Sequence, residues 1–153
     1  MVEHDPDATR LAYSQVKASG PEDCGCGGCK NWLMARPTVY PREFLDMLDR
    51  LGIDSTKESE VYDVAEVPEK PKSHYYGGWF HFFGTISFDK DVMPEVVQIS
   101  DIFSYSIHLG DAPAPDVFAS SKGTSRIEFN TIAPWLISDE EYARSAPKGS
   151  GGL

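Results

Sequence analysis

All three cysteines of this 153-residue chain lie in the segment 24–29, which reads CGCGGC. A secreted disulfide framework spreads an even number of cysteines along its chain. This cluster instead favours a protein that folds in a reducing, cytoplasmic compartment. Glycines separate the thiols, and glycine lets the backbone approach a bound ion or a partner sulfur closely. The segment therefore predicts a tight loop built around the cysteines, and it marks the candidate site.

The spacing of apolar residues predicts two short helices after this segment. The first spans residues 28–36, where side chains recur at helical intervals, and Pro37 ends it. The second begins at Pro41, because proline suits the first helical position, and it carries one apolar stripe. Gly52 suits the left-handed conformation that often follows the last turn of a helix.

Alternating and apolar runs predict strands in the second half of the chain. The run 75–88 is apolar on both faces, so we expect a central strand that is covered on both sides. Helices followed by successive strands indicate an α+β fold. We expect two short N-terminal helices packed on a mainly antiparallel sheet of about four or five strands. The other expected strand segments are 59–66, 103–109 and 126–131, and residues 96–99 are expected to form a short element.

The chain length predicts a single domain, which we place at residues 1–144, followed by a flexible tail at 145–153. Residues 1–9 are acidic and predict a loose N-terminal segment without the pattern of a signal peptide. Residues 10–17 leave a short strand and a helical turn both open. Residues 19–23 contain glycine and proline and predict a loop.

The net charge of −10 argues against nucleic acid as a partner, because phosphate binding needs a basic surface. It also argues against an anionic membrane surface, and no apolar run approaches the roughly 20 residues of a membrane-spanning helix. Hydrophobic residues make up 41% of the chain, so it is expected to be a soluble, globular protein.

The first functional hypothesis is a zinc site. Thiolates bind Zn²⁺ at about 2.3 Å, and the spacing of Cys26 and Cys29 is that of a zinc knuckle. Cys24 is the expected third ligand. The chain has no second cysteine pair, so His81 or His74 is expected to complete the tetrahedron. With only three protein ligands, water would take the fourth position and hydrolytic chemistry would be open.

Two other hypotheses compete with zinc. A thiol oxidoreductase or redox sensor would use Cys26 as nucleophile and Cys29 as resolving thiol, since a helix N-terminus lowers the pKa of a thiol. The segment before the motif is not the strand of a thioredoxin-like unit, and Asp23 disfavours a thiolate. A metal-free binding module would instead use the aromatic residues of 75–88 as its surface.

Four motifs occur in order along residues 24–137: Cys26-Gly-Gly-Cys-Lys-Asn-Trp32, the helix 41–54, Tyr76-Gly-Gly-Trp-Phe-His-Phe82, and Pro134-Trp135. In this combination the chain resembles a family of uncharacterised bacterial proteins. That family has no known function, so the resemblance implies no activity. The sequence therefore predicts a small protein with a structural zinc ion that acts in protein interaction. Whether it catalyses a reaction stays open.

Overall fold

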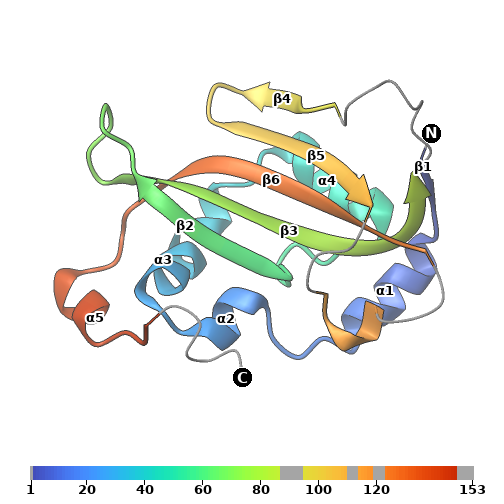
Figure 1. The fold of residues 1–153 in the computed structure, drawn as a ribbon, viewed down its shortest axis with the longest axis horizontal. Coiled ribbons are helices and arrows are strands. Elements are labelled where there is room, and N and C mark those ends of the chain that lie inside the picture. Colours follow the sequence, from blue (N-terminus) through green and yellow to red (C-terminus); the bar gives the residue numbers. More distant parts are fainter. Residues whose placement is uncertain (1, 87–94, 110–113, 119–122, 148–153) are drawn as a thin grey trace.

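A computed structural model describes residues 2–86, 95–109, 114–118 and 123–147, which form a curled sheet and helices packed on it (Figure 1). Helices and strands are mixed, as the α+β prediction requires. The elements are β1 (Val2–His4), α1 (Pro6–Ser14), α2 (Gly20–Cys24), α3 (Gly27–Ala35), a 3₁₀ turn (Arg36–Thr38), α4 (Arg42–Leu51), β2 (Glu60–Glu66), β3 (Ser73–Ile86), β4 (Val97–Ser100), β5 (Phe103–Leu109), a 3₁₀ turn (Asp116–Phe118), β6 (Thr124–Pro134) and α5 (Asp139–Ala143).

The long strand β3 lies inside the sheet and pairs with other strands along both of its edges. One edge pairs with β6 from Ser73 to Phe83, and the other pairs first with β2 and then with β1. Beyond β6 follow β5 and β4, and every strand pairing named here is antiparallel. The mainly antiparallel sheet is therefore confirmed, and the described part of the chain contributes six strands to it.

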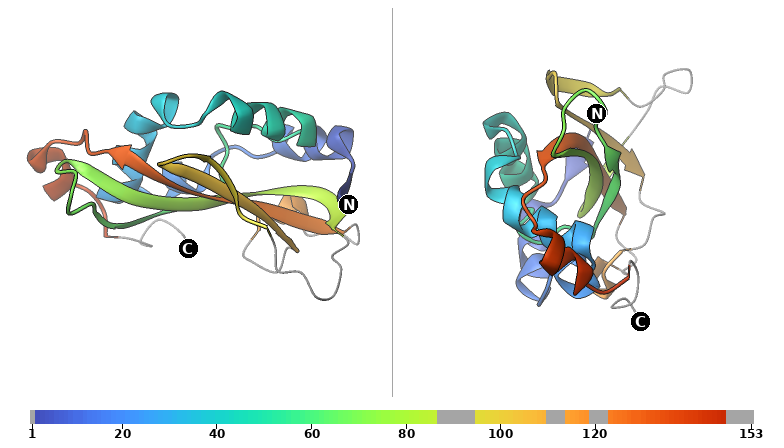
Figure 2. Two further views of the ribbon diagram at one scale, coloured as in Figure 1. Left: turned by 90° about the horizontal axis from the view of Figure 1, so that it is seen from above. Right: turned by 90° about the vertical axis from the view of Figure 1, so that its left-hand side faces the viewer.

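The helices α1, α3 and α4 lie on one face of the sheet, as the view from above shows (Figure 2). An aromatic core fills the space between these layers. The ring of Trp32 stacks on Phe129 of β6 at 5.4 Å between centroids, and Phe44 meets Phe103 of β5 at 4.8 Å. All four rings are fully buried, so they hold α3 and α4 to the sheet through apolar contact.

A buried carboxylate joins α3 to the loop that precedes β2. Glu58 accepts hydrogen bonds from the Trp32 indole nitrogen at 2.8 Å and the Tyr40 hydroxyl at 2.8 Å. Its second oxygen pairs with the Arg36 guanidinium at 2.6 Å. Three donors thus satisfy a carboxylate that is only 1% exposed.

The number of predicted helices is wrong. Both predicted helices exist as α3 and α4, and Gly52 adopts the expected left-handed conformation with φ of +82°. The described residues add α1, α2 and α5. Residues 2–9 of the expected loose segment 1–9 are ordered, because Val2–His4 pairs with β3 and Asp5 caps α1 by accepting a hydrogen bond from the Ala8 amide at 3.0 Å.

The predicted loop 19–23 is also wrong, because α2 begins there with a capping box. The Ser19 hydroxyl accepts from the Glu22 amide, and the Glu22 carboxylate accepts from the Ser19 amide at 3.2 Å. The Ser19 hydroxyl, which donates to the Glu22 carboxylate at 2.8 Å, and the Ser19 amide together hold the pKa of Glu22 below its ordinary value. The pattern Ser-x-x-Glu in the sequence indicates such a helix start.

Two further predictions fall partly outside the described residues. The predicted strand 75–88 is confirmed as β3 as far as Ile86, and residues 87–88 lie beyond the description. Residues 145–147 of the predicted tail lie against the cysteines, since the Ala146 amide donates to the Gly25 carbonyl at 3.2 Å, while 148–153 are not described. Among the described helices, none has the length and apolar character to cross a bilayer.

Candidate metal centre

The three cysteines converge because two helices meet at a single glycine. The helix α2 ends at Cys24, and Gly25 reverses the chain in the left-handed conformation, with φ of +69°. Cys26 is then extended and caps the N-terminus of α3, whose first turn contains Cys29. Glycine adopts a positive φ at little cost, so the residue between the two helices is the one that brings the thiols together.

The ligand atoms of Cys24, Cys26 and Cys29 all lie within 4.8 Å of one another, and all three residues are buried. The Cys26 sulfur accepts a hydrogen bond from the Cys29 amide at 3.4 Å. Three sulfurs around one tetrahedral zinc ion at 2.3 Å are about 3.8 Å apart. The cluster is therefore compact enough to ligate one metal ion, and none of the thiols is in a disulfide.

Asn31 fixes α3 against the end of β6. Its amide nitrogen donates to the Tyr76 hydroxyl at 3.2 Å and to the Pro134 carbonyl at 3.0 Å. Its oxygen accepts from the amides of Leu136 at 2.6 Å and Ile137 at 3.0 Å. The buried side chain thus uses its full hydrogen-bonding capacity to join α3 to the segment that leads into α5.

Tyr76 ties the first turn of α3 to β3. Its hydroxyl donates to the Gly28 carbonyl at 2.7 Å, and Gly28 lies between Cys26 and Cys29 in the sequence. Burial raises the pKa of Tyr76 well above its ordinary value, so this hydroxyl keeps its proton and remains a donor at neutral pH. The backbone that carries Cys26 and Cys29 is therefore anchored to the sheet.

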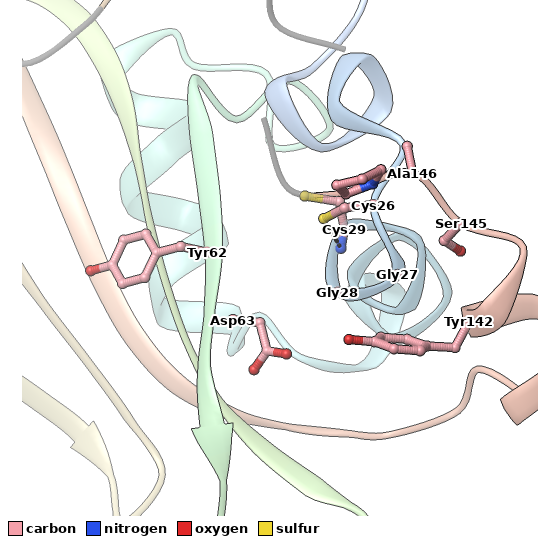
Figure 3. Close-up of a pocket in the computed structure, with 10 residues that line it drawn as sticks. Cys26, Gly27, Gly28, Cys29, Tyr62, Asp63, Tyr142, Ser145 and Ala146 are labelled. Carbon is pink, nitrogen blue, oxygen red and sulfur yellow. Dashed lines mark hydrogen bonds between the residues drawn. The ribbon is translucent and has the colours of Figure 1, made fainter. Parts of the chain in front are cut away.

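A pocket of about 430 Å³ lies beside the cysteines, and Figure 3 shows its lining. Asp63 reaches it from β2 and Tyr142 from α5, and both lie near the end of α3 that carries Gly27 and Gly28. The full lining comprises Cys26, Gly27, Gly28, Cys29, Tyr62, Asp63, Tyr142, Ser145, Ala146 and Pro147.

Neither predicted histidine lies in the cysteine group. The described residues include every histidine of the chain, and the group of close ligand atoms contains the cysteines alone. His81 is fully buried, with its Nδ1 at 2.7 Å from the Ser59 hydroxyl. His74 instead lies with its Nδ1 at 2.8 Å from the Asp63 carboxylate. The expectation that one of them closes the same cluster therefore does not fit this geometry.

The register of the sheet explains this separation. The Cys29 sulfur lies 4.0 Å from the Val61 carbonyl oxygen, and Val61 pairs with Gly78 of β3. His81 is three residues from Gly78 and His74 is four residues away in the other direction. At about 3.3 Å per residue, these histidines lie roughly 10 and 13 Å from Gly78 along the strand.

Sequence reasoning missed Asp63 and Tyr142 as residues of the site. Each comes from an element far along the chain, and neither belongs to a local motif with the cysteines. The glycine pair does carry a partial indication. A Cβ atom at Gly27 would lie 2.2 Å from the Tyr142 ring, and one at Gly28 would lie 3.0 Å from the Asp63 Cβ. Adjacent glycines thus mark a close approach without identifying what approaches.

Comparisons of this chain with models of known protein families, with curated proteins and with solved structures give no match. The resemblance to uncharacterised bacterial proteins therefore stays a prediction. The functional argument rests on the geometry of the cysteines and the pocket.

Proposed function

We propose that the protein binds one zinc ion through Cys24, Cys26 and Cys29 and that this ion has a structural role. The observation that carries the proposal is the convergence of three buried thiols whose ligand atoms lie within 4.8 Å of one another. Thiolates are the ligands of soft and borderline metals, and zinc is the commonest of these in tetrahedral structural sites. The ion would link the end of α2 to the start of α3.

The proposed role of the stabilised region is protein interaction in the cytoplasm. The segment that Asn31 anchors to α3 presents Leu136, which is 50% exposed, and Tyr142, which is 53% exposed. Aromatic side chains such as that of Tyr142 are enriched at protein–protein interfaces. The acidic charge of the chain disfavours nucleic acid and anionic lipid as that partner.

Thiol redox chemistry is the second candidate, and the position of Cys26 favours it. Cys26 caps α3, and the partial positive charge of a helix N-terminus stabilises a thiolate. Cys29 lies in the first turn and could resolve a mixed disulfide. An oxidised Cys26–Cys29 pair would require an external disulfide or peroxide as acceptor for two electrons.

Untagged protein purified without chelator is expected to contain one zinc ion per chain by plasma mass spectrometry. Blocking the thiols should release it. Each of C24S, C26S and C29S should weaken zinc binding at least about 100-fold, because loss of a direct ligand exceeds the 10- to 100-fold cost of losing an outer hydrogen-bond partner. The melting temperature of each variant should fall and lose its dependence on zinc.

The variant H108Q is the matched control, because it removes a potential ligand atom that lies outside both the cysteine group and the pocket. It should keep one zinc per chain. No metal with two of the three thiols oxidised, and recovered by a reductant, would contradict the zinc proposal and favour redox chemistry. No metal with three reduced thiols would leave a metal-free binding module with its aromatic surface.

A further inference from the structure

We infer that the fourth coordination position of the proposed metal opens into the adjacent pocket and takes a small neutral oxygen or nitrogen donor. This inference rests on the proposed metal site and adds the class of ligand that the site accepts. Water would occupy the position at rest. A neutral heterocyclic amine such as imidazole would displace it, with Asp63 as the acceptor of a hydrogen bond from the bound donor.

The ligand count leaves one position for an external molecule. Zinc in proteins is almost always four-coordinate. The described residues include every cysteine and every histidine of the chain, and no histidine or described carboxylate joins the three thiols within 4.8 Å. Zinc sites with three protein ligands and one exchangeable position are the arrangement found in catalytic and ligand-binding centres.

Two of the three thiols that would hold the metal line the pocket. Cys26 and Cys29 line the pocket, whereas Cys24 is not part of its lining. The Cys29 sulfur also lies 4.0 Å from the Val61 carbonyl oxygen of β2. A molecule that enters the pocket therefore meets the thiols of Cys26 and Cys29 first, next to the start of α3 (Figure 3).

The glycine pair shapes the pocket walls. Neither Gly27 nor Gly28 has a Cβ, so the Tyr142 ring and the Asp63 side chain lie directly against the first turn of α3. The pocket is consequently lined by a phenol ring and a carboxylate as well as by Cys26 and Cys29. Its volume of about 430 Å³ is many times the roughly 30 Å³ of one water molecule, so a small organic donor fits.

A chain of contacts orients Asp63. Its carboxylate lies 2.8 Å from the His74 Nδ1, and the His74 ring stacks on Trp135 with 3.9 Å between centroids. The Trp135 ring in turn contacts Tyr142 at 5.7 Å. Carboxylates held in this way accept hydrogen bonds from metal-bound donors in many zinc sites. Asp63 is therefore a positioning residue for the bound molecule.

Charge selects the class of ligand. Three thiolates and one Zn²⁺ ion carry a net charge of −1, and the Asp63 carboxylate in the same pocket adds another negative charge. The chain as a whole carries −10. An anion in the fourth position would meet repulsion from both groups, whereas a neutral donor would not. The pocket therefore favours neutral nitrogen or oxygen donors over azide, carboxylates or phosphate.

Cobalt-substituted protein tests this inference, because the visible spectrum of tetrahedral Co²⁺ reports a change in a single ligand. The full chain is loaded with one equivalent of Co²⁺ and titrated with imidazole and, separately, with sodium azide. We expect a saturable spectral change with imidazole and an affinity for azide that is at least about tenfold weaker. The variant D63N should keep one Co²⁺ per chain. It should also reduce the difference between the affinities for imidazole and azide, because it removes the negative charge of the Asp63 side chain.

The variant D46N is the matched control. It makes the same charge change at an exposed site on α4, where the Asp46 side chain is 65% exposed, and should leave both affinities unchanged. Bound cobalt whose spectrum responds to neither ligand would overturn the inference and leave the structural metal site intact. Equal effects of D63N and D46N would overturn the role of Asp63. Failure to bind cobalt or zinc would overturn both the inference and the proposed function.

Discussion

Replacement of Glu58 by alanine is expected to lower the free energy of unfolding by about 3–5 kcal/mol. The carboxylate is 1% exposed and accepts hydrogen bonds from Trp32 and Tyr40 while it pairs with Arg36. Its removal leaves the Trp32 and Tyr40 donors without their acceptor and takes the counter-charge from the Arg36 guanidinium, whose side chain is only 16% exposed. Loss of one partner of a buried ion pair costs far more than the pair contributes net, because the remaining charge stays desolvated.

Urea denaturation followed by circular dichroism measures this effect. The control is D46A, because Asp46 pairs with Arg42 at 3.7 Å and their side chains are 65% and 86% exposed. Loss of such a surface pair should change the free energy of unfolding by less than about 1 kcal/mol. Equal stability of E58A and D46A would contradict the prediction. If E58A does not fold, E58Q should fold with intermediate stability, since its amide oxygen still accepts hydrogen bonds.

Glu58 also shows where sequence reasoning reaches its limit. A glutamate in a polar stretch between a helix and a strand is expected to be exposed, and its local pattern does not distinguish it from Glu60 or Glu66. Its burial follows from tertiary packing. The side chains of Trp32 and Tyr40 both donate hydrogen bonds to the Glu58 carboxylate once α3 packs on the sheet. Networks of this kind depend on elements far apart in sequence.

Long elements with a periodic apolar pattern were predictable. The helix α4 and the strands β3, β5 and β6 are predictable from apolar spacing, because each buries at least one face against the core. The strand β2 is predictable from its apolar residues although only Val61 of it is buried. The short helix α2 has only five residues and no visible period. Its capping box, Ser19 with Glu22, was the available indication, and it is a weaker one than periodicity.

The site was predictable in part, because only some of its residues are close together in the sequence. The spacing of Cys26 and Cys29 is local, so the candidate site could be located from cysteine and glycine alone, although the helix before it was missed. The residues that could lie near the fourth coordination position are far from the cysteines in the sequence. An imidazole on an apolar strand needs a partner, which a metal ion or a neighbouring side chain can supply, and the Ser59 hydroxyl lies at 2.7 Å from the Nδ1 of His81. Only the register of β2 on β3 places Asp63 beside the cysteines.

Alkaline unfolding is the second large effect that we expect. Burial raises the pKa of Tyr13, Tyr40 and Tyr76 above the ordinary tyrosine value of 10, with smaller increases from nearby carboxylates. Because the folded-state pKa is raised, the folded chain holds these protons when the unfolded chain has released them. The stability they contribute is complete below about pH 10 and is lost as the pH rises through the folded pKa values.

Above pH 10, each of these tyrosines lowers the free energy of unfolding by up to about 1.4 kcal/mol per pH unit. The three together lower it by about 4 kcal/mol per pH unit. A domain of ordinary stability, about 5–15 kcal/mol, would lose that stability within roughly one to four pH units above pH 10. Tyrosinate absorbance and circular dichroism, recorded on the same samples, measure the transition. Of the seven tyrosines in the chain, these three should ionise only together with the loss of secondary structure.

The variant Y13F isolates one contribution. The Tyr13 hydroxyl donates to the His81 carbonyl at 2.7 Å inside the core, and its removal should reduce the alkaline slope by about one third, since one of three linked protons is gone. Y142F is the matched control, because that ring is 53% exposed. Ionisation of all seven tyrosines before any loss of circular dichroism would contradict the prediction. It would mean that the three buried hydroxyls exchange protons without opening of the core.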